Sequence, residues 1–138
     1  MAHPIDVEIV AADRKVFSGT AGSVTVPGID GYFGVLAGHA PLISALAIGI
    51  VELRAHEAGV PQLFAVAGGF VEVTPEKVTI LADAAEAPAE IDAERARLAA
   101  ERAEERLRAP EPGIDVTRAQ ASLLRALNRL RLIGQYGK

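Results

Sequence analysis

The sequence of 138 residues contains no cysteine and no tryptophan, and only six of its residues are aromatic. Without cysteine, disulfide frameworks, thiolate nucleophiles and iron–sulfur or cysteine-based zinc centres are excluded. Long hydrophobic runs are also missing. The longest candidate, residues 40–51, is interrupted by Pro41, Ser44 and Gly49, and a membrane-spanning helix needs roughly 18 apolar residues. The first six residues show no basic stretch followed by an apolar one, so we expect no secretory signal. These absences predict a soluble protein of a reducing compartment.

The composition changes abruptly near Pro88. Ten of the 13 glycines and all four phenylalanines precede this point, whereas alanine, arginine, glutamate and leucine dominate after it. Residues 1–89 hold ten acidic and four basic side chains, while residues 90–138 hold eight acidic and ten basic ones. We therefore predict two domains, residues 1–88 and residues 89–138.

The first part has the pattern of short β-strands. Apolar and polar residues alternate with the period of two that is typical of half-buried strands, and turn residues such as the 74–77 segment separate the runs. The strand candidates are 5–9, 24–26, 50–54, 63–67, 70–73 and 78–81. Short strands at this spacing predict an antiparallel β-sandwich or barrel rather than strand–helix–strand units.

The second part has the pattern of two antiparallel helices. Residues 91–109 contain neither glycine nor proline, and Asp92 is placed to cap the first helix. The prolines and glycine of residues 110–113 must end it, and Asp115 or Thr117 can begin a second helix that runs to about Ile133. Alanine and leucine recur at helical spacing on the facing sides. Because alanine buries little apolar area, we expect this seam to hold the hairpin only weakly.

The sequence offers little for catalysis or metal binding. The glycine-rich segment 27–34 lacks the Lys-Ser/Thr end of a phosphate loop, so a turn between strands is the better interpretation. The three histidines lie too far apart for a metal motif, and His39, close to Ser44, has no acid nearby to complete a triad. We expect neither a catalytic nor a metal site.

Arginines on both predicted helices allow three interpretations. Arg95, Arg102 and Arg106, together with Asp92, flank the alanine stripe of the first helix, and Arg118, Arg125 and Arg129 share a face of the second. They can form a solvated surface with local ion pairs, or converge on an anion, since guanidinium groups suit phosphate oxygens. Alternatively, the basic last helix can dock on an acidic partner. The formal net charge of −4 and the lack of aromatic residues among the arginines disfavour nucleic acid.

Three ordered motifs, at residues 34–42, 67–73 and 78–83, resemble the epsilon subunit family of bacterial F-type (F1Fo) ATP synthases. The resemblance extends over essentially the whole chain, including residues 17–19 and the helical pair. It implies a ten-stranded β-sandwich followed by a helical hairpin. It also implies a non-catalytic central-stalk subunit that binds the gamma subunit and the c-ring and helps couple proton-driven rotation to gamma. Such a subunit is peripheral, on the cytoplasmic face of the bacterial inner (plasma) membrane.

The resemblance further implies a regulatory hairpin. In this family the compact hairpin permits turnover, whereas the hairpin extended along gamma reaches the alpha/beta catalytic head and blocks ATP hydrolysis. No cofactor is obligatory, but residues 91–96 match the Ile/Leu-Asp-x-x-Arg-Ala motif by which some members bind ATP. The implied ATP-binding residues are Glu86, Ile91, Asp92, Arg95, Ala96, Arg102, Arg125 and Arg129.

The implied contacts to the c-ring and the foot of gamma are Gly31, Tyr32, Phe33, His39 and Pro41. Two of these segments depart from the family pattern. Ala37 replaces a proline that commonly precedes the Gly-His pair, and Tyr32 stands where other members often carry an acid. The alternative from another class is a free β-sandwich interaction module with a helical oligomerisation tail, which co-purification with gamma would distinguish.

Overall fold

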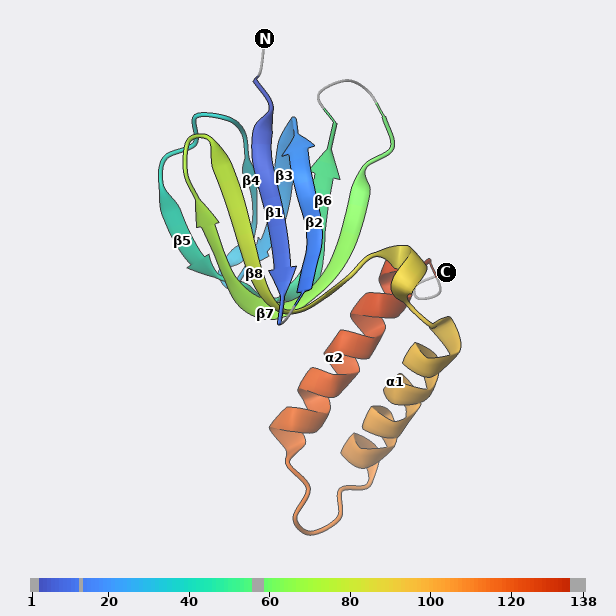
Figure 1. Ribbon diagram of the computed structural model, residues 1–138. Coiled ribbons are helices and arrows are strands. Elements are labelled where there is room, and N and C mark those ends of the chain that lie inside the picture. Colours follow the sequence, from blue (N-terminus) through green and yellow to red (C-terminus); the bar gives the residue numbers. More distant parts are fainter. Residues whose placement is uncertain (1–2, 13, 56–58, 135–138) are drawn as a thin grey trace. The chain divides into compact units, whose positions relative to one another are not determined.

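The computed structural model describes residues 3–12, 14–55 and 59–134 (Figure 1). The chain divides into two compact units, residues 1–87 and residues 88–138. The first unit contains eight strands within the described residues: β1 Ile5–Ala11, β2 Arg14–Ala21, β3 Ser23–Gly28, β4 Gly31–Val35, β5 Leu42–Ala45, β6 Ile48–Arg54, β7 Gln62–Val73 and β8 Lys77–Glu86. The second unit contains a short 3-10 turn, η1 (Pro88–Glu90), and two helices, α1 (Ala93–Arg108) and α2 (Val116–Leu132).

The strands form one sheet in the order β2-β1-β8-β7-β6-β3-β4, and β5 pairs with β7. All neighbours are antiparallel except β1 and β8, which run parallel from Asp6 opposite Lys77 to Ala11 opposite Ala82. The expectation of a purely antiparallel sandwich was therefore wrong in this detail, and the described residues hold eight strands where the family resemblance implied ten. The parallel pair arises because the first strand lies beside the last one, to which no tight turn connects it.

The core lies between the layers of the folded sheet. Figure 1 shows β3, β4 and β6 behind β1, β2 and β8, and buried side chains from both layers form a single apolar cluster. Alternate residues of β1 (Ile5, Val7 and Ile9) point into it, as the alternating sequence predicts. Most of its fully buried side chains are valine and isoleucine. Phe17 and Phe64 meet edge to face with their ring centroids 5.7 Å apart. β-Branched side chains thus fill the sandwich without tryptophan.

A pair of glycines lets β7 change the face that it turns to the core. Phe64 and Val66 are buried before the pair, and Val71 and Val73 after it, so the alternation shifts by one residue. Gly68 and Gly69 have φ angles of +70° and +111°, which side-chain-bearing residues rarely adopt. A Cβ at Gly69 would overlap the Leu81 carbonyl oxygen and lie 2.8 Å from the Ala82 Cα. This close approach of β7 to β8 requires glycine.

The helical unit is a hairpin whose seam is built mainly from small residues. Both helices begin at an aspartate cap: Asp92 Oδ1 accepts a hydrogen bond from the Arg95 N–H, and Asp115 Oδ1 from the Arg118 N–H, each at 3.0 Å. The second helix therefore starts after Asp115 rather than at Thr117. The buried seam consists of Ala96, Ala100, Ala126 and Leu130. Within the described residues, neither helix is long and apolar enough to cross a membrane.

We predict that Gly69→Ala lowers the free energy of unfolding of the sandwich by about 2–4 kcal/mol, because it adds both backbone strain and a clash with β8. Differential scanning calorimetry of the purified protein would measure this loss. Gly34→Ala is the matched control, because Gly34 also lies in a strand but has open space around its Cβ position. Equal stability of the two variants would contradict this account of the bend.

Candidate functional site

The arginines of the hairpin lie in two stripes with identical spacing. Arg102 and Arg106 follow Arg95 by seven and eleven residues, and Arg125 and Arg129 follow Arg118 by the same intervals. Seven and eleven residues are close to two and three whole turns of α-helix, so each set occupies one side of its helix. We call the six residues the arginine face.

The two stripes lie on the same side of the hairpin. On each helix, the arginine stripe is rotated from the buried seam by about 100° around the helix axis, in the direction opposite to the rotation of the advancing chain. Because the helices are right-handed and run in opposite directions, this offset carries both stripes to one face. A hollow of about 390 Å³ supports this placement, since Arg106 of α1 and Arg118 of α2 both line it.

Acidic side chains of α1 lie on a different side of the helix. Arg97 Nη1 contacts Glu101 Oε1 at 2.6 Å, and its Nε and Nη2 donate to the Glu94 carboxylate. The hydrogen bond to Glu94, followed by the charges of Glu94 and Glu101, raises the pKa of Arg97 above its ordinary value. This pair of acids neutralises an arginine outside the arginine face.

Most of the arginine face has no internal counter-charge. Among the residues that the structure describes, the side chains of Arg95, Arg102, Arg106 and Arg118 make neither an ion pair nor a hydrogen bond. Arg125 Nη2 donates to Ser122 Oγ at 3.1 Å. Guanidinium groups that are exposed and unpaired are free to bind the oxygens of an external anion.

The proposed ATP-binding residues occupy different environments. The Asp92 carboxylate serves as the cap of α1, Ile91 is half-buried just before it, and Ala96 is buried in the seam. Ala96 shares that seam with Leu130, so Arg95 and Arg129 lie at the same end of the hairpin. Glu86 ends β8 and belongs to the other unit. Arg102, Arg125 and the rest of the hairpin set belong to the arginine face.

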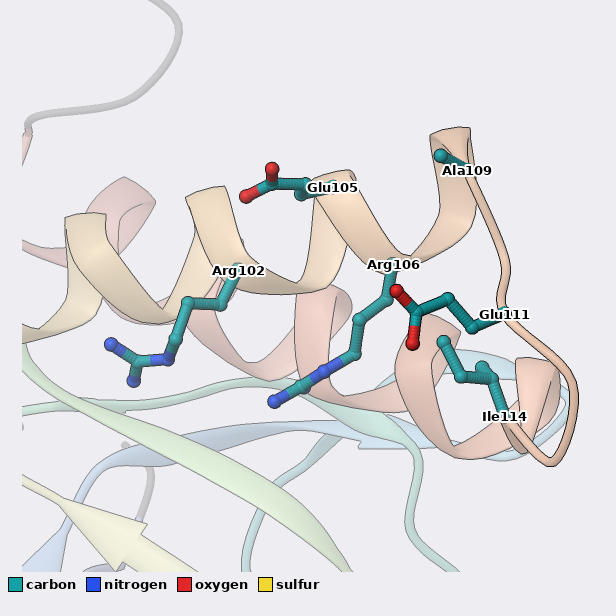
Figure 2. Close-up of a pocket in the computed structure, with 6 residues that line it drawn as sticks. All are labelled: Arg102, Glu105, Arg106, Ala109, Glu111 and Ile114. Atoms are coloured by element: carbon teal, nitrogen blue, oxygen red, sulfur yellow. The ribbon is translucent and has the colours of Figure 1, made fainter.

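A second hollow, of about 400 Å³, lies where α1 meets the loop between the helices. Figure 2 shows the Arg102 and Arg106 side chains extending to the same side of α1, while the Glu105 carboxylate lies away from them. Arg106 and Arg118, which line the hollow of about 390 Å³, belong to the predicted arginine helices but lie outside the implied ATP-binding set, and Ser122, which also lines it, was not predicted. The spacing of Ser122, one turn from both Arg118 and Arg125, was the available signal. No cluster of three metal-ligating side chains occurs in the described part of the chain.

The proposed stalk contacts in the sandwich divide into two groups. Gly31 begins β4 after the turn from β3, whereas His39 and Pro41 follow the other end of that strand. The structure therefore does not bring these groups together. Phe33 is half-buried and packs against the core, so it offers little surface to a partner. His39 Nδ1 donates to the Ala40 carbonyl oxygen at 2.7 Å.

Tyr32 is 59% exposed but is tied back to its own sheet. Its hydroxyl oxygen accepts a hydrogen bond from the Ile50 N–H at 2.9 Å. The ring end lies over Gly49, where an added Cβ would come within 2.6 Å of the hydroxyl oxygen. Tyr32 therefore presents the side of a fixed ring rather than a mobile tip.

One outer face of the sandwich carries large apolar side chains. Ile43 of β5, Phe70 of β7 and Leu81 of β8 are 70%, 59% and 52% exposed. Phe70 lies opposite both Leu81 and Ala45, and Ile43 is two residues from Ala45, so all three large side chains share one face. We call Ile43, Phe70 and Leu81 the apolar sheet face. Exposed apolar side chains grouped in this way mark interaction surfaces.

Comparison with known families divides the chain within one residue of the boundary in the structure. The family described as ATP synthase, Delta/Epsilon chain, beta-sandwich domain matches residues 4–88, and the corresponding long alpha-helix domain matches residues 89–134. The ATP synthase epsilon chain of Moorella thermoacetica is 51% identical over 94% of this chain and 96% of its own. That of Halalkalibacterium halodurans is 48% identical over 95% and 98%.

Solved structures give the same result. A chain of the Euglena gracilis mitochondrial ATP synthase, in its OSCP/F1/c-ring assembly, is 27% identical with a TM-score of 0.76, covering 88% of this chain and 76% of that one. A chain of the Tetrahymena thermophila enzyme, at 13% identity and a TM-score of 0.56, shares the fold. Together, the two matched domains and the bacterial relatives show that the chain belongs to the delta/epsilon family of ATP synthases, as an epsilon-type, non-catalytic subunit of the stalk.

Proposed function

We propose that this subunit couples rotation of the proton-driven c-ring to the gamma subunit and, through it, to the alpha/beta catalytic head. The apolar sheet face is the observation that carries the proposal, because a torque-bearing subunit needs a firm contact with its neighbour. As part of this complex, the subunit would be peripheral to the cytoplasmic face of the bacterial inner membrane.

The apolar sheet face is the surface that we assign to gamma. Its three side chains lie on β7 and on the two strands that pair with it, β5 and β8, so they form a rigid platform rather than a mobile loop. Burying a large apolar side chain at an interface contributes about 1.5–3 kcal/mol. Aromatic residues such as Phe70 are enriched at the centres of such interfaces.

The two ends of β4 supply further contacts. Tyr32 offers a fixed aromatic ring, and the segment containing His39 and Pro41 is held by a hydrogen bond from the Gly38 N–H to the Pro75 carbonyl oxygen at 2.8 Å. We assign these positions, with Gly31, to the c-ring and the foot of gamma. Phe33, which packs against the core, would support β4 between these two groups of contacts.

We predict that Phe70→Gln combined with Leu81→Gln weakens co-purification of the subunit with gamma by about tenfold or more, because each change removes apolar area from the contact. Val60→Gln is the control, since Val60 is 92% exposed and lies outside the apolar sheet face. Unchanged recovery of gamma with the double variant would refute the assignment of this face. Recovery of self-oligomers without gamma from the unmodified chain would favour the alternative of a free interaction module.

The arginine face supports binding of ATP to the closed hairpin. Arg95 and Arg129 lie at the end of the hairpin that carries the Ile91–Ala96 motif, and Arg102 and Arg125 extend the same stripes. These donors fit the charge and oxygen geometry of a triphosphate. The capping bond of Asp92 holds the backbone of Arg95 at the first turn of α1. ATP would act as a regulatory ligand whose negative charge is bound by the arginines. Because its affinity for the closed hairpin would exceed that for the open one, it would stabilise the closed state.

We predict that ATP binds the isolated protein and that Arg95→Ala lowers its affinity about tenfold or more, since hydrogen bonds to charged groups are worth about 1.5–3 kcal/mol. Isothermal titration calorimetry with ATP measures the change. Arg97→Ala, which removes an arginine from the same helix but outside the arginine face, should leave the affinity unaltered. Absence of binding at millimolar ATP, or equal affinity in Arg95→Ala, would rule out the nucleotide role.

The hairpin is also proposed to inhibit ATP hydrolysis when it opens and reaches the catalytic head. Its buried seam contains three alanines and one leucine, with the partly buried Leu123, Leu127 and Ile133 packed against it, so most of the fully buried contact between the helices comes from alanine. An element whose two packings differ by only a few kcal/mol can act as a switch.

We predict that a chain shortened to residues 1–89 still assembles with gamma and raises the ATPase activity of the assembled enzyme. The sandwich has its own core, so the truncation should not unfold it. Steady-state ATPase assays and subunit stoichiometry of the purified complex measure the two effects. Intact assembly with unchanged hydrolysis would exclude an inhibitory hairpin.

A further inference from the structure

The arginine face is longer than one nucleotide motif requires. Arg95 and Arg106 are eleven residues apart, which corresponds to about 16 Å along α1. The motif residues lie at the first turn of α1, whereas the hollow of about 390 Å³ lies at the opposite end, beside the loop between the helices. This hollow therefore calls for a separate explanation.

We propose that the hollow between Arg106 and Arg118 is a second oxyanion site, suited to a small phosphate-bearing molecule. The proposal does not depend on the function proposed above. It concerns a different end of the hairpin and residues outside the nucleotide set.

Three side chains that can donate hydrogen bonds line the hollow: those of Arg106, Arg118 and Ser122. The side chains of Arg106 and Arg118 have no partner among the residues that the structure describes. Ser122 also lines the hollow, and its oxygen accepts a hydrogen bond from Arg125, which leaves the hydroxyl proton available to donate. Two guanidinium forks and a hydroxyl match the several oxygens of a phosphate group.

One carboxylate, that of Asp115, lines the hollow, but it forms no ion pair with Arg106 or Arg118 within the described residues. Asp115 Oδ1 accepts the N-terminal hydrogen bond of α2 from the Arg118 N–H. Figure 2 shows Glu105 directed away from the Arg106 guanidinium and Glu111 on the loop beside the Arg106 side chain. Neither glutamate forms an ion pair with Arg106 within the described residues. The guanidinium of Arg106 thus remains available to an external anion.

The walls of the hollow define the size and kind of ligand. The half-buried Ile114 and the buried Ala119 provide an apolar wall between the two arginines. The volume lies near the lower end of the range of about 300–1,000 Å³ found for small-molecule sites. A diphosphate or a small phosphate ester fits these features better than a bulky polyanion. A bulky polyanion would instead be attracted by an open arginine stripe without such a hollow.

The test is titration of the full chain with inorganic diphosphate at fixed ionic strength, followed by calorimetry and by amide chemical shifts in NMR spectra. We expect saturable binding, with the largest shifts at residues 113–122. The double variant Arg106→Gln with Arg118→Gln should lower diphosphate affinity about tenfold or more. The corresponding double lysine variant should recover only part of it, because lysine keeps the charge but not the fork.

Two further variants separate this site from its alternatives. Arg97→Gln, an exposed arginine of the same helix, should leave diphosphate affinity unchanged. Arg95→Gln with Arg129→Gln should also leave it unchanged while lowering the affinity for ATP, which shows that the sites are distinct. The proposal is overturned if diphosphate does not bind at millimolar concentration. It is equally overturned if the Arg95/Arg129 pair removes diphosphate binding, or if the Arg106/Arg118 pair lowers ATP affinity as much as diphosphate affinity.

Discussion

The close approach of β7 to β8 at Gly69 is the constraint on which the sandwich depends. At this point backbone atoms of β8 occupy the space that any side chain would need. The bend lets one continuous strand contribute buried residues of opposite parity before and after it, so that a single sheet can enclose its own core. The segment between β5 and β6 is attached at the bend, because the Leu46 N–H donates to the Gly69 carbonyl oxygen at 2.8 Å.

The same bend determines what the sandwich can show to a partner. Phe70 follows Gly69 directly and faces outward, whereas Phe64, on the other side of the bend, is buried. Had the alternation continued without a shift, Phe70 would face the core and Val71 would face solvent. The apolar sheet face is therefore a product of the glycine pair. An interaction surface placed next to a rigid backbone contact fits the coupling role proposed for this subunit.

Sequence patterns were sufficient for the architecture but not for every contact. The β-sandwich, the helical hairpin and the cap at Asp92 follow from local alternation, helical spacing and capping chemistry, and the structure confirms them. The parallel pairing of β1 with β8 could not be predicted, because it joins residues about 70 positions apart and no local turn signals it. The inward packing of Phe33 and the bond between Tyr32 and the Ile50 N–H also depend on tertiary neighbours. In the hairpin, the sequence located the arginines, but only the antiparallel arrangement places both stripes on one face.

The hairpin combines a weak attraction with a built-in repulsion. Each buried alanine methyl of the seam contributes under about 1 kcal/mol. The two arginine stripes run along the same face, so like charges oppose closure, by about 0.4 kcal/mol for a pair 10 Å apart in water. The apolar contacts outweigh the repulsion, but the repulsion lowers the net stability of the closed state. An anion that bridges the stripes replaces repulsion with charge-assisted hydrogen bonds and stabilises closure by mass action. If anions bind the arginine face as proposed, closure of this hairpin would depend on them, at whichever end of the stripe they lie.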